Sequence, residues 1–414
     1  MNRYRPDSAH AFLQQPGDGA DFRASALEQL KERGLPTPKL ERWKYTNLLA
    51  FEKSGAAPAE KARFQGDVVR LPWLQQNSRK LIFVNGHLIL GDAKLTLAGQ
   101  GLDHRPDTAP MDDQADGMLW ALNTAFYADG PCITADESCS GQTFEIIHVA
   151  QGADAPLLSS PRSVIEVLPN CQATIIEQWM GTGTGVVHSN HALRISVGQN
   201  AQLNHIRLQN DRIDRSVLSS THVRLARDAR YHCTFQTTGA ATSRQEFWIE
   251  LHGQAADATI HGAQLMTGKQ VMDTTILIEH QAPNCTSNQT IRNVVDGHAS
   301  GVFQGKVHVH KIAQKTDGYQ LCNTIMLSPT AEMNTKPELE IYADDVKCSH
   351  GTTTGKLDET SLFYLQSRGI PQAEARRLLL MAFVASVFDN LPDDIQAACM
   401  AQTQDFLSLI KGED

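Results

Sequence analysis

The sequence contains no apolar run long enough to cross a bilayer, because its longest run, Leu378 to Val387, falls well short of the roughly 20 residues that a membrane helix needs. Positive charge is also scarce. The 37 Lys and Arg residues against 46 Asp and Glu residues give a net charge of -9, without a dense basic block. This balance argues against a nucleic-acid surface.

The cysteines and the first residues of the sequence both indicate an intracellular protein. The eight cysteines are scattered without the spacing of a disulfide framework, which suits reduced thiols of the cytosol. The first residues, Met1 to Asp7, lead into polar sequence without an apolar segment, so we expect no secretory signal. We therefore predict a soluble, cytoplasmic protein whose partners are proteins or small molecules, with neither nucleic acid nor membrane among them.

The usual catalytic motifs are missing as well. There is no HExxH, GxSxG or GxGxxG. The segment Gly351 to Lys356 resembles a phosphate loop only superficially, because three residues separate its glycines where the motif has four, and no Ser or Thr follows the lysine. Four carboxylates near predicted helix ends are best explained as capping or solvated charge: Glu374, Asp389, Asp393 and Asp394. We expect no nucleotide site and no catalytic site on this chain.

What the sequence does contain is a long β-rich region. From about Thr143 to Val346, short β-type runs alternate with Gly, Asn and Asp. Five similar six-residue segments begin at positions that differ by 30, 28, 27 and 29 residues: Cys171, Ala201, Ala229, Ala256 and Cys285. This spacing suits the coils of a parallel β-solenoid. A large β-sandwich remains the alternative.

Helices are expected at both ends. Asp21 to Arg33 is typical of a helix that stops at Gly34. Asp358 is a good N-cap for a helix through Gln366, and Pro371 begins a helix reaching about Phe388. Helical regions at the two ends could cover the exposed strand edges of a solenoid.

The helix from Pro371 is apolar almost all round, so it needs cover on two sides. The last segment, from Asp393 to Ile410, could supply that cover within the chain. The alternative is that part of the helix docks onto another protein, with these candidate contact residues: Leu378, Leu379, Met381, Phe383, Val384 and Phe388.

The most informative segment is K-P-E-L-E-I-Y-A-D-D-V-K-C-S-H-G, from Lys336 to Gly351. Its alternation predicts a strand, and the apolar phase changes at Asp344 and Asp345, which implies a bend there. In an extended backbone, Cys348 and His350 project to the same face. A thiolate and an imidazole suit iron, copper or zinc, but two ligands are too few for a closed site, so a partner or an iron–sulfur unit would complete it.

Other candidate ligands have simpler explanations. His308 and His310 share one strand face with Lys306, and strand alternation alone explains a polar face, so we interpret the pair as structural. Cys285 and Cys322 are interpreted as buried small hydrophobes.

Three segments resemble the SufB/SufD family of the Suf iron–sulfur cluster assembly machinery: E-R-W-K-Y-T at Glu41 to Thr46, the Lys336 to Gly351 segment, and L-F-Y-L-Q-S-R-G-I at Leu362 to Ile370. The W-K-Y-T segment favours the SufD branch. The resemblance implies a right-handed parallel β-helix core, residues 79–352, between an N-terminal helical region, residues 1–78, and a C-terminal helical domain, residues 353–414.

The resemblance also implies partners and a site. It predicts a non-catalytic subunit that pairs with SufB through the end of the β-helix and binds the ATPase SufC through the C-terminal helices. A transient iron–sulfur cluster would lie at the SufB interface, with His350 as a ligand and Cys348 as the adjacent thiol. It leaves open whether the resting complex holds a cluster or reduced flavin, and whether the isolated chain forms a homodimer. Two other hypotheses are a carbohydrate-active β-solenoid enzyme and a homodimeric structural or storage protein.

Overall fold

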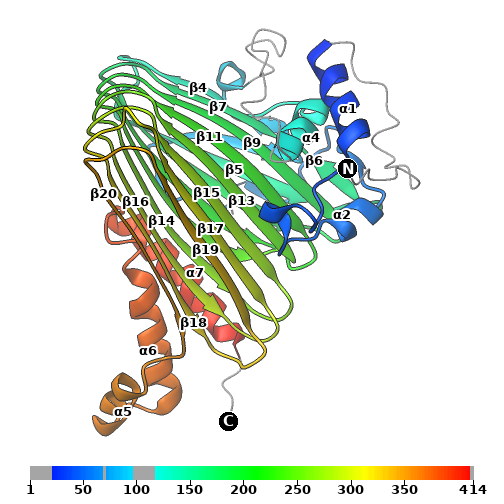
Figure 1. The fold of residues 1–414 in the computed structure, drawn as a ribbon. Coiled ribbons are helices and arrows are strands. Elements are labelled where there is room, and N and C mark those ends of the chain that lie inside the picture. The colour runs from blue at the N-terminus through cyan, green and yellow to red at the C-terminus, as the bar shows by residue number, and fades with distance from the viewer. Residues whose placement is uncertain (1–20, 69–70, 97–116, 411–414) are drawn as a thin grey trace.

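The fold is a parallel β-solenoid of about seven turns with helices at both ends, which confirms the predicted fold class (Figure 1). The computed structural model describes residues 21–68, 71–96 and 117–410. Each coil contributes one strand to each of two sheets, so strands that are neighbours in space alternate along the sequence. The division into residues 1–78, 79–352 and 353–414 stays a prediction.

The first sheet follows the order β1 (Ala57–Pro58), β6 (Leu157–Ser159), β9 (Val187–Val197), β11 (Ser216–Leu225), β13 (Thr242–Leu251), β15 (Val271–His280), β17 (Ser300–Val309) and β19 (Glu332–Ile341), with β7 (Arg162–Val167) pairing β9 and β4 (Cys132–Ala135) pairing β7. The second sheet follows the order β20 (Lys347–Gly355), β18 (Asp317–Met326), β16 (Thr286–Val295), β14 (Asp257–Met266), β12 (Arg230–Gly239), β10 (Gln202–Asp211), β8 (Gln172–Thr182), β5 (Gln142–Gln151), β2 (Arg79–Val84) and β3 (His87–Leu90).

The predicted repeat marks one corner of the solenoid. All five repeat residues are buried, and each stands directly before a strand of the second sheet. The residue before each of them has a positive φ, between 55° and 62°, at Asn170, Asn200, Asp228, Ala255 and Asn284. The backbone N–H of each of these left-handed residues donates to a carbonyl of the next coil, as in Asn200 to Arg227 (2.9 Å). Asn and Asp tolerate this conformation best among residues with a Cβ, which explains their recurrence.

The solenoid interior is one apolar cluster that runs through most coils. Inward positions alternate along each strand with outward ones, and aromatic rings such as Phe144, Phe235 and Phe303 fill the space between the sheets. The antiparallel pair β2 and β3 closes the second sheet at its N-terminal end, and the Asn85-Gly86 turn that joins the two strands has positive φ at both residues. Such a two-residue turn matches the twist of a hairpin.

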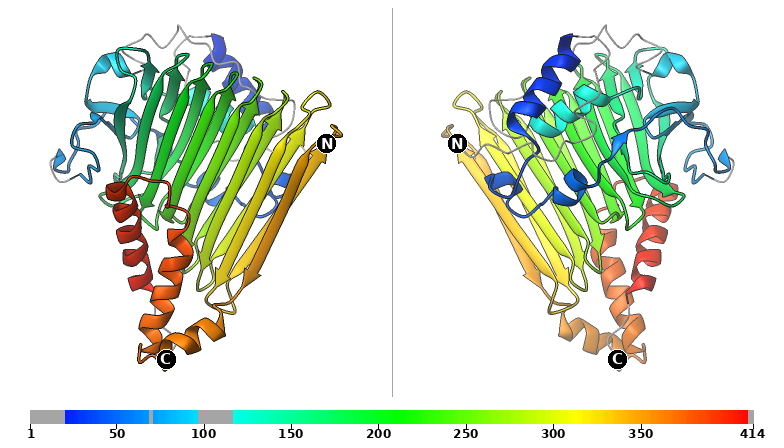
Figure 2. Two further views of the ribbon diagram at one scale, coloured as in Figure 1. Left: turned by 90° about the vertical axis from the view of Figure 1, so that its left-hand side faces the viewer. Right: turned by 90° about the vertical axis from the view of Figure 1, so that its right-hand side faces the viewer.

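The helices cover the outer faces of the two sheets, as the two views of Figure 2 show. On the first sheet, α1 (Asp21–Arg33) packs against α4 (Met118–Phe126), which contacts β9 and β11. The helix α4 lies within residues 79–352, the predicted β-helix core, where no helix was expected. The chain before α4 also contains α2 (Leu49–Lys53) and the short 3-10 helices η2 (Glu41–Trp43) and η4 (Ala93–Leu95).

On the second sheet, α6 (Gln372–Ala385) and α7 (Asp393–Leu409) pack over apolar side chains of β10, β14 and β16, while α5 (Glu359–Ser367) extends away from the solenoid. Asp358 caps α5 as predicted, accepting from the backbone N–H groups of Thr360 and Ser361. Pro371 occupies the N-cap of α6 and not its first turn, and α6 ends at Ala385, short of the predicted Phe388.

The expectation that terminal helices cover the strand edges is wrong at the C-terminal end. Within the described residues, β19 pairs only with β17 and β20 only with β18, so the outer edges of both strands are free. The helices lie over sheet faces because the apolar surface to be buried is there. Figure 2 shows β20 as the last strand at this end.

Candidate functional site

Cys348 and His350 lie on β20, the last strand of the solenoid. Cys348 is in register with Gly318 of β18, and His350 with Gln320. Gln320 is fully buried and alternates with the core residue Cys322, so this face of β18 points into the solenoid. Cys348 and His350 therefore share the inward face at the open end, as the sequence predicted.

A corner of the chain places this strand. Asp344 and Asp345 form a bend between β19 and β20, where a bend was predicted. The bend carries the chain from the first sheet to the second. Lys315 reinforces it, because its N–H donates to the Asp345 carbonyl (2.5 Å).

The two candidate ligands differ in environment. Cys348 is half-buried against an apolar cluster that includes Val307, Val309 and Ala343, whereas His350 is exposed. Burial raises the pKa of the Cys348 thiol, so in the isolated chain it is a protonated thiol at neutral pH. Binding a metal would deprotonate it, since the thiolate is the ligand form.

Two buried amides lie next to His350 in the same inward row. Gln320 neighbours His350 on one side and Gln289 of β16 on the other. Within the described residues, neither side-chain amide has a hydrogen-bond partner, although both are fully buried. Buried amides without partners are costly, so they are free to bind a polar group that enters from the open end. Sequence reasoning missed them because a glutamine in a strand carries no distinctive signal.

The E-R-W-K-Y-T segment fastens the N-terminal region onto the first sheet. Trp43 is fully buried with the Arg244 guanidinium 3.8 Å from its ring centroid, and the Thr46 hydroxyl donates to Asp273. Arg244 is also ion-paired with Asp273. The Glu41 carboxylate accepts from Lys336 Nζ (2.6 Å), which joins this segment to the start of the Lys336 to Gly351 segment. The two most informative sequence motifs thus meet in space.

Comparisons with known proteins place the chain among relatives. Residues 148–383 match the family model described as SUF system FeS cluster assembly, SufBD core domain. The iron–sulfur cluster assembly protein SufD of Escherichia coli is 30% identical over 376 residues, which cover 89% of this chain and 88% of the relative. An iron–sulfur cluster assembly SufBD family protein of Synechocystis is 28% identical, with 89% and 87% covered.

The chain belongs to the SufBD family. The match includes both Cys348 and His350, and the name of the Escherichia coli relative agrees with the predicted SufD branch. A third relative, the chloroplastic protein ABCI7 of Arabidopsis thaliana, is 30% identical over 67% of this chain and 60% of its own length. A role in iron–sulfur cluster assembly follows for this SufBD chain. Among the described residues, no helix has the length and apolarity that a membrane span requires.

In this SufBD chain, the predicted contact residues of the C-terminal helices fall into a buried group and a more exposed group. Val384 and Phe388 are fully buried in the cluster between α6, α7 and the second sheet, so they pack within the chain. Leu378 is exposed, and three more are half-buried: Leu379, Met381 and Phe383. The α7 helix supplies the intramolecular cover that was one of the two alternatives.

The largest exposed apolar side chains of this region lie on α5. Phe363 is 71% exposed and Tyr364 is 56% exposed. Both belong to the Leu362 to Ile370 segment, for which the sequence predicted no contact. Their exposure is visible only once α5 is seen to extend away from the solenoid.

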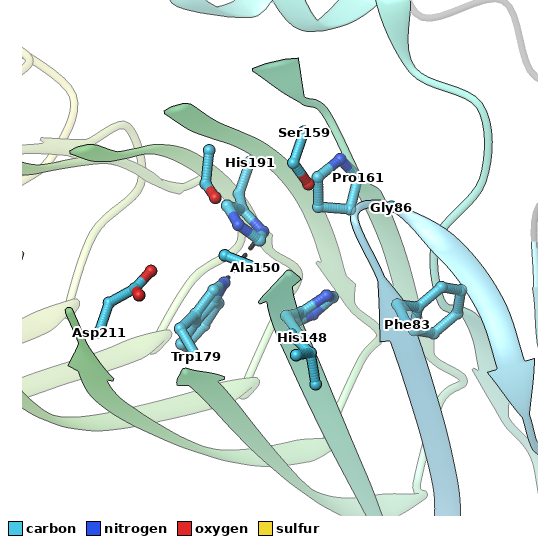
Figure 3. A pocket seen from close by; sticks show the side chains of 11 residues that line it. Phe83, Gly86, His148, Ala150, Ser159, Pro161, Trp179, His191 and Asp211 are labelled. Atoms are coloured by element: carbon cyan, nitrogen blue, oxygen red, sulfur yellow. Dashed lines mark hydrogen bonds between the residues drawn. The ribbon is translucent and has the colours of Figure 1, made fainter. Parts of the chain in front are cut away.

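A cavity inside the N-terminal coils is too small for a cofactor. It measures about 10 Å³, room for at most one water molecule. Figure 3 shows Trp179 and His191 facing each other within it, joined by a bond from the indole N–H to Nδ1 of His191 (2.9 Å). The neighbouring His148 bonds to the buried carboxylate of Glu177 (3.3 Å), which also contacts His205 (2.9 Å). This network satisfies buried polar groups, and we assign it a structural role.

Proposed function

We propose that this SufBD chain is a non-catalytic scaffold subunit that pairs with SufB through the free edges of β19 and β20 and holds a nascent iron–sulfur cluster at that boundary. One observation carries the proposal: a thiol and an imidazole share the inward face of a strand whose outer edge no described strand pairs with. An unpaired strand edge is a template for pairing with another chain.

The chemistry of the two side chains fits a cluster that is built and then passed on. Thiolate sulfur and imidazole nitrogen are both iron ligands in iron–sulfur proteins. Two ligands leave a cluster incompletely held, so the partner would supply the rest. The raised pKa of Cys348 supports this role, because the thiol becomes a ligand only when iron displaces its proton.

The C-terminal helices would bind SufC. The exposed residues of α5 and α6 form an apolar surface on a part of the chain that extends from the solenoid: Phe363, Tyr364 and Leu378. Aromatic side chains of this kind are favoured at protein interfaces. ATP hydrolysis would belong to SufC, and movement of SufC would reach the cluster site through α6 and the strands that it contacts.

Alanine at position 350 tests the cluster site. Cells that depend on this chain would produce His350→Ala, Cys348→Ser or the control His298→Ala, which removes an exposed turn histidine. We expect all three chains to co-purify with SufB and SufC, and His350→Ala to lose most of the iron and acid-labile sulfide of the complex. Cluster content equal to that of the control would contradict the ligand role of His350.

A further inference from the structure

A second group of potential metal ligands lies on the outer face of the first sheet. The register of β15 and β17 sets Glu279 beside His308, and His310 follows just beyond the end of β17. One ligand atom from each of the three residues lies within 4.8 Å of the other two. In residues 21–68, 71–96 and 117–410, no other group of three His, Cys, Asp or Glu side chains meets this condition.

The imidazoles are arranged for a common ligand. The ring centroids of His308 and His310 are 4.3 Å apart, and Nδ1 of His308 lies 3.4 Å from Oε1 of Glu279. The Nε2 atom of His310 is buried and has no hydrogen-bond partner within the described part of the chain. A buried ring nitrogen without a partner calls for an explanation, and a bound ion would supply it.

Neighbouring residues orient the Glu279 carboxylate and neutralise the positive charge of Lys306. Gln281 donates to the second oxygen of Glu279 (2.8 Å), which orients the carboxylate in the way that outer-shell partners orient metal ligands. Lys306, on the same strand face, is ion-paired with Glu340. That ion pair balances the charge of the Lys306 ammonium group beside the three ligands.

We propose that Glu279, His308 and His310 bind a divalent transition-metal ion of the Zn²⁺ or Fe²⁺ type. Two imidazoles and one carboxylate form the ligand set of open zinc and non-haem iron sites, which leave a position for water or another ligand. The hard cations Ca²⁺ and Mg²⁺ prefer oxygen ligands alone. Small rotations of three half-buried side chains bring their ligand atoms round one ion.

This metal site is separate from the candidate cluster site. Val307 and Val309 alternate with His308 on β17 and point to the opposite face, where they pack in the same cluster as Cys348. The two sites therefore lie on opposite faces of one strand. The third ligand, Glu279, belongs to the preceding coil and joins His308 and His310 only through strand register, so the sequence alone indicated a structural pair.

The test uses the full chain with Cys348→Ser and His350→Ala, so that the candidate cluster site cannot contribute. Co²⁺ is titrated into this metal-free protein and followed by its visible absorption, and Zn²⁺ is then added in competition. We expect one Co²⁺ to bind per chain and Zn²⁺ to displace it. In the same background, Gln281→Ala should weaken binding about tenfold, the usual effect of removing an outer-shell partner.

Ligand variants decide the assignment. His308→Ala, His310→Ala and the isosteric Glu279→Gln should each weaken binding more than Gln281→Ala does. The matched control is His232→Ala, which removes a histidine paired with a carboxylate, Asp257 (3.2 Å), where no third ligand atom completes such a group among the described residues. Circular dichroism would verify that each variant is folded. Absence of Co²⁺ binding, or equal affinity in the ligand variants and the control, would overturn the proposal.

Discussion

At the residue scale, the buried ion pair of Arg244 and Asp273 ties the N-terminal region to the solenoid. Both side chains are fully buried. Replacing Arg244 with Met leaves the Asp273 carboxylate without a cation, so we predict a loss of about 3–5 kcal/mol in the free energy of unfolding. Denaturant unfolding would measure it. The control Arg212→Met removes a side chain that is 46% exposed and ion-paired with the exposed Asp214, and it should cost under about 1 kcal/mol. Equal losses would contradict the prediction.

Glu250 makes stability sensitive to acid. Burial alone would raise the pKa of its carboxyl, but hydrogen bonds from His222 and Arg224 outweigh burial and lower it from 4.5 to about 2. The folded-state pKa is depressed, so the stabilisation is complete above the unfolded pKa and is lost as the pH falls. We predict that the wild-type chain loses more stability between pH 4.5 and pH 2 than Glu250→Gln does. Urea midpoints across this window would measure the difference, and parallel pH profiles would argue against it.

At the element scale, β20 has one bonded edge and, in the part of the chain that the structure describes, one free edge. The backbone N–H of Lys347 donates to the carbonyl of Thr316 in the neighbouring coil. Successive backbone N–H groups along a strand point to opposite edges, so the N–H of Thr352 points to the free edge and that of Thr353 points toward β18. We predict that Thr352→Pro leaves the isolated chain nearly as stable but prevents its pairing with SufB, because proline is tolerated only where no ladder bond is made.

The matched variant is Thr353→Pro, which removes a bond to β18 and should lower the thermal midpoint of the isolated chain. Thermal unfolding and co-purification with SufB would be measured for both. Mass measurement of the isolated chains would show in addition whether the same edge pairs two copies of this protein. Undiminished SufB binding by Thr352→Pro would place the interface elsewhere.

The sequence predicted the elements that have a local signal and missed those that depend on distant contacts. The repeat at Cys171 and its equivalents was visible because a corner needs a left-handed residue followed by a small buried one. The strands of the first sheet do not share this marker, so their positions were not predicted. Lys315 and Thr316 continue the corner with different residue types and were missed for that reason.

The candidate site was predictable only in part. Alternation placed Cys348 and His350 on one face, but the buried amides of Gln289 and Gln320 beside them come from earlier coils. The contact of Glu41 with Lys336 joins residues 295 positions apart. Contacts of this length follow from strand register and docking, which residue type alone does not encode.

At the scale of the whole molecule, the two proposed partner surfaces are separated: the strand edges left free within the described residues lie at the end of the solenoid, and α5 extends away from it. We predict that Phe363→Asp weakens SufC binding without changing the thermal midpoint or SufB binding. The matched control is Leu409→Asp on α7, since both side chains are 71% exposed. Binding would be measured by titration with purified SufC. Equal effects of the two substitutions would show that α5 is not a specific contact.

The alternation of the chain between two sheets limits how a protein of this kind can change in length. Inserting a whole coil adds one strand to each sheet and leaves every later side chain facing as before. Inserting half a coil would transfer all later strands to the opposite sheet, and would move the thiol and imidazole of β20 to the other side of the molecule. Length variation that preserves the terminal chemistry is therefore restricted to complete circuits of the backbone.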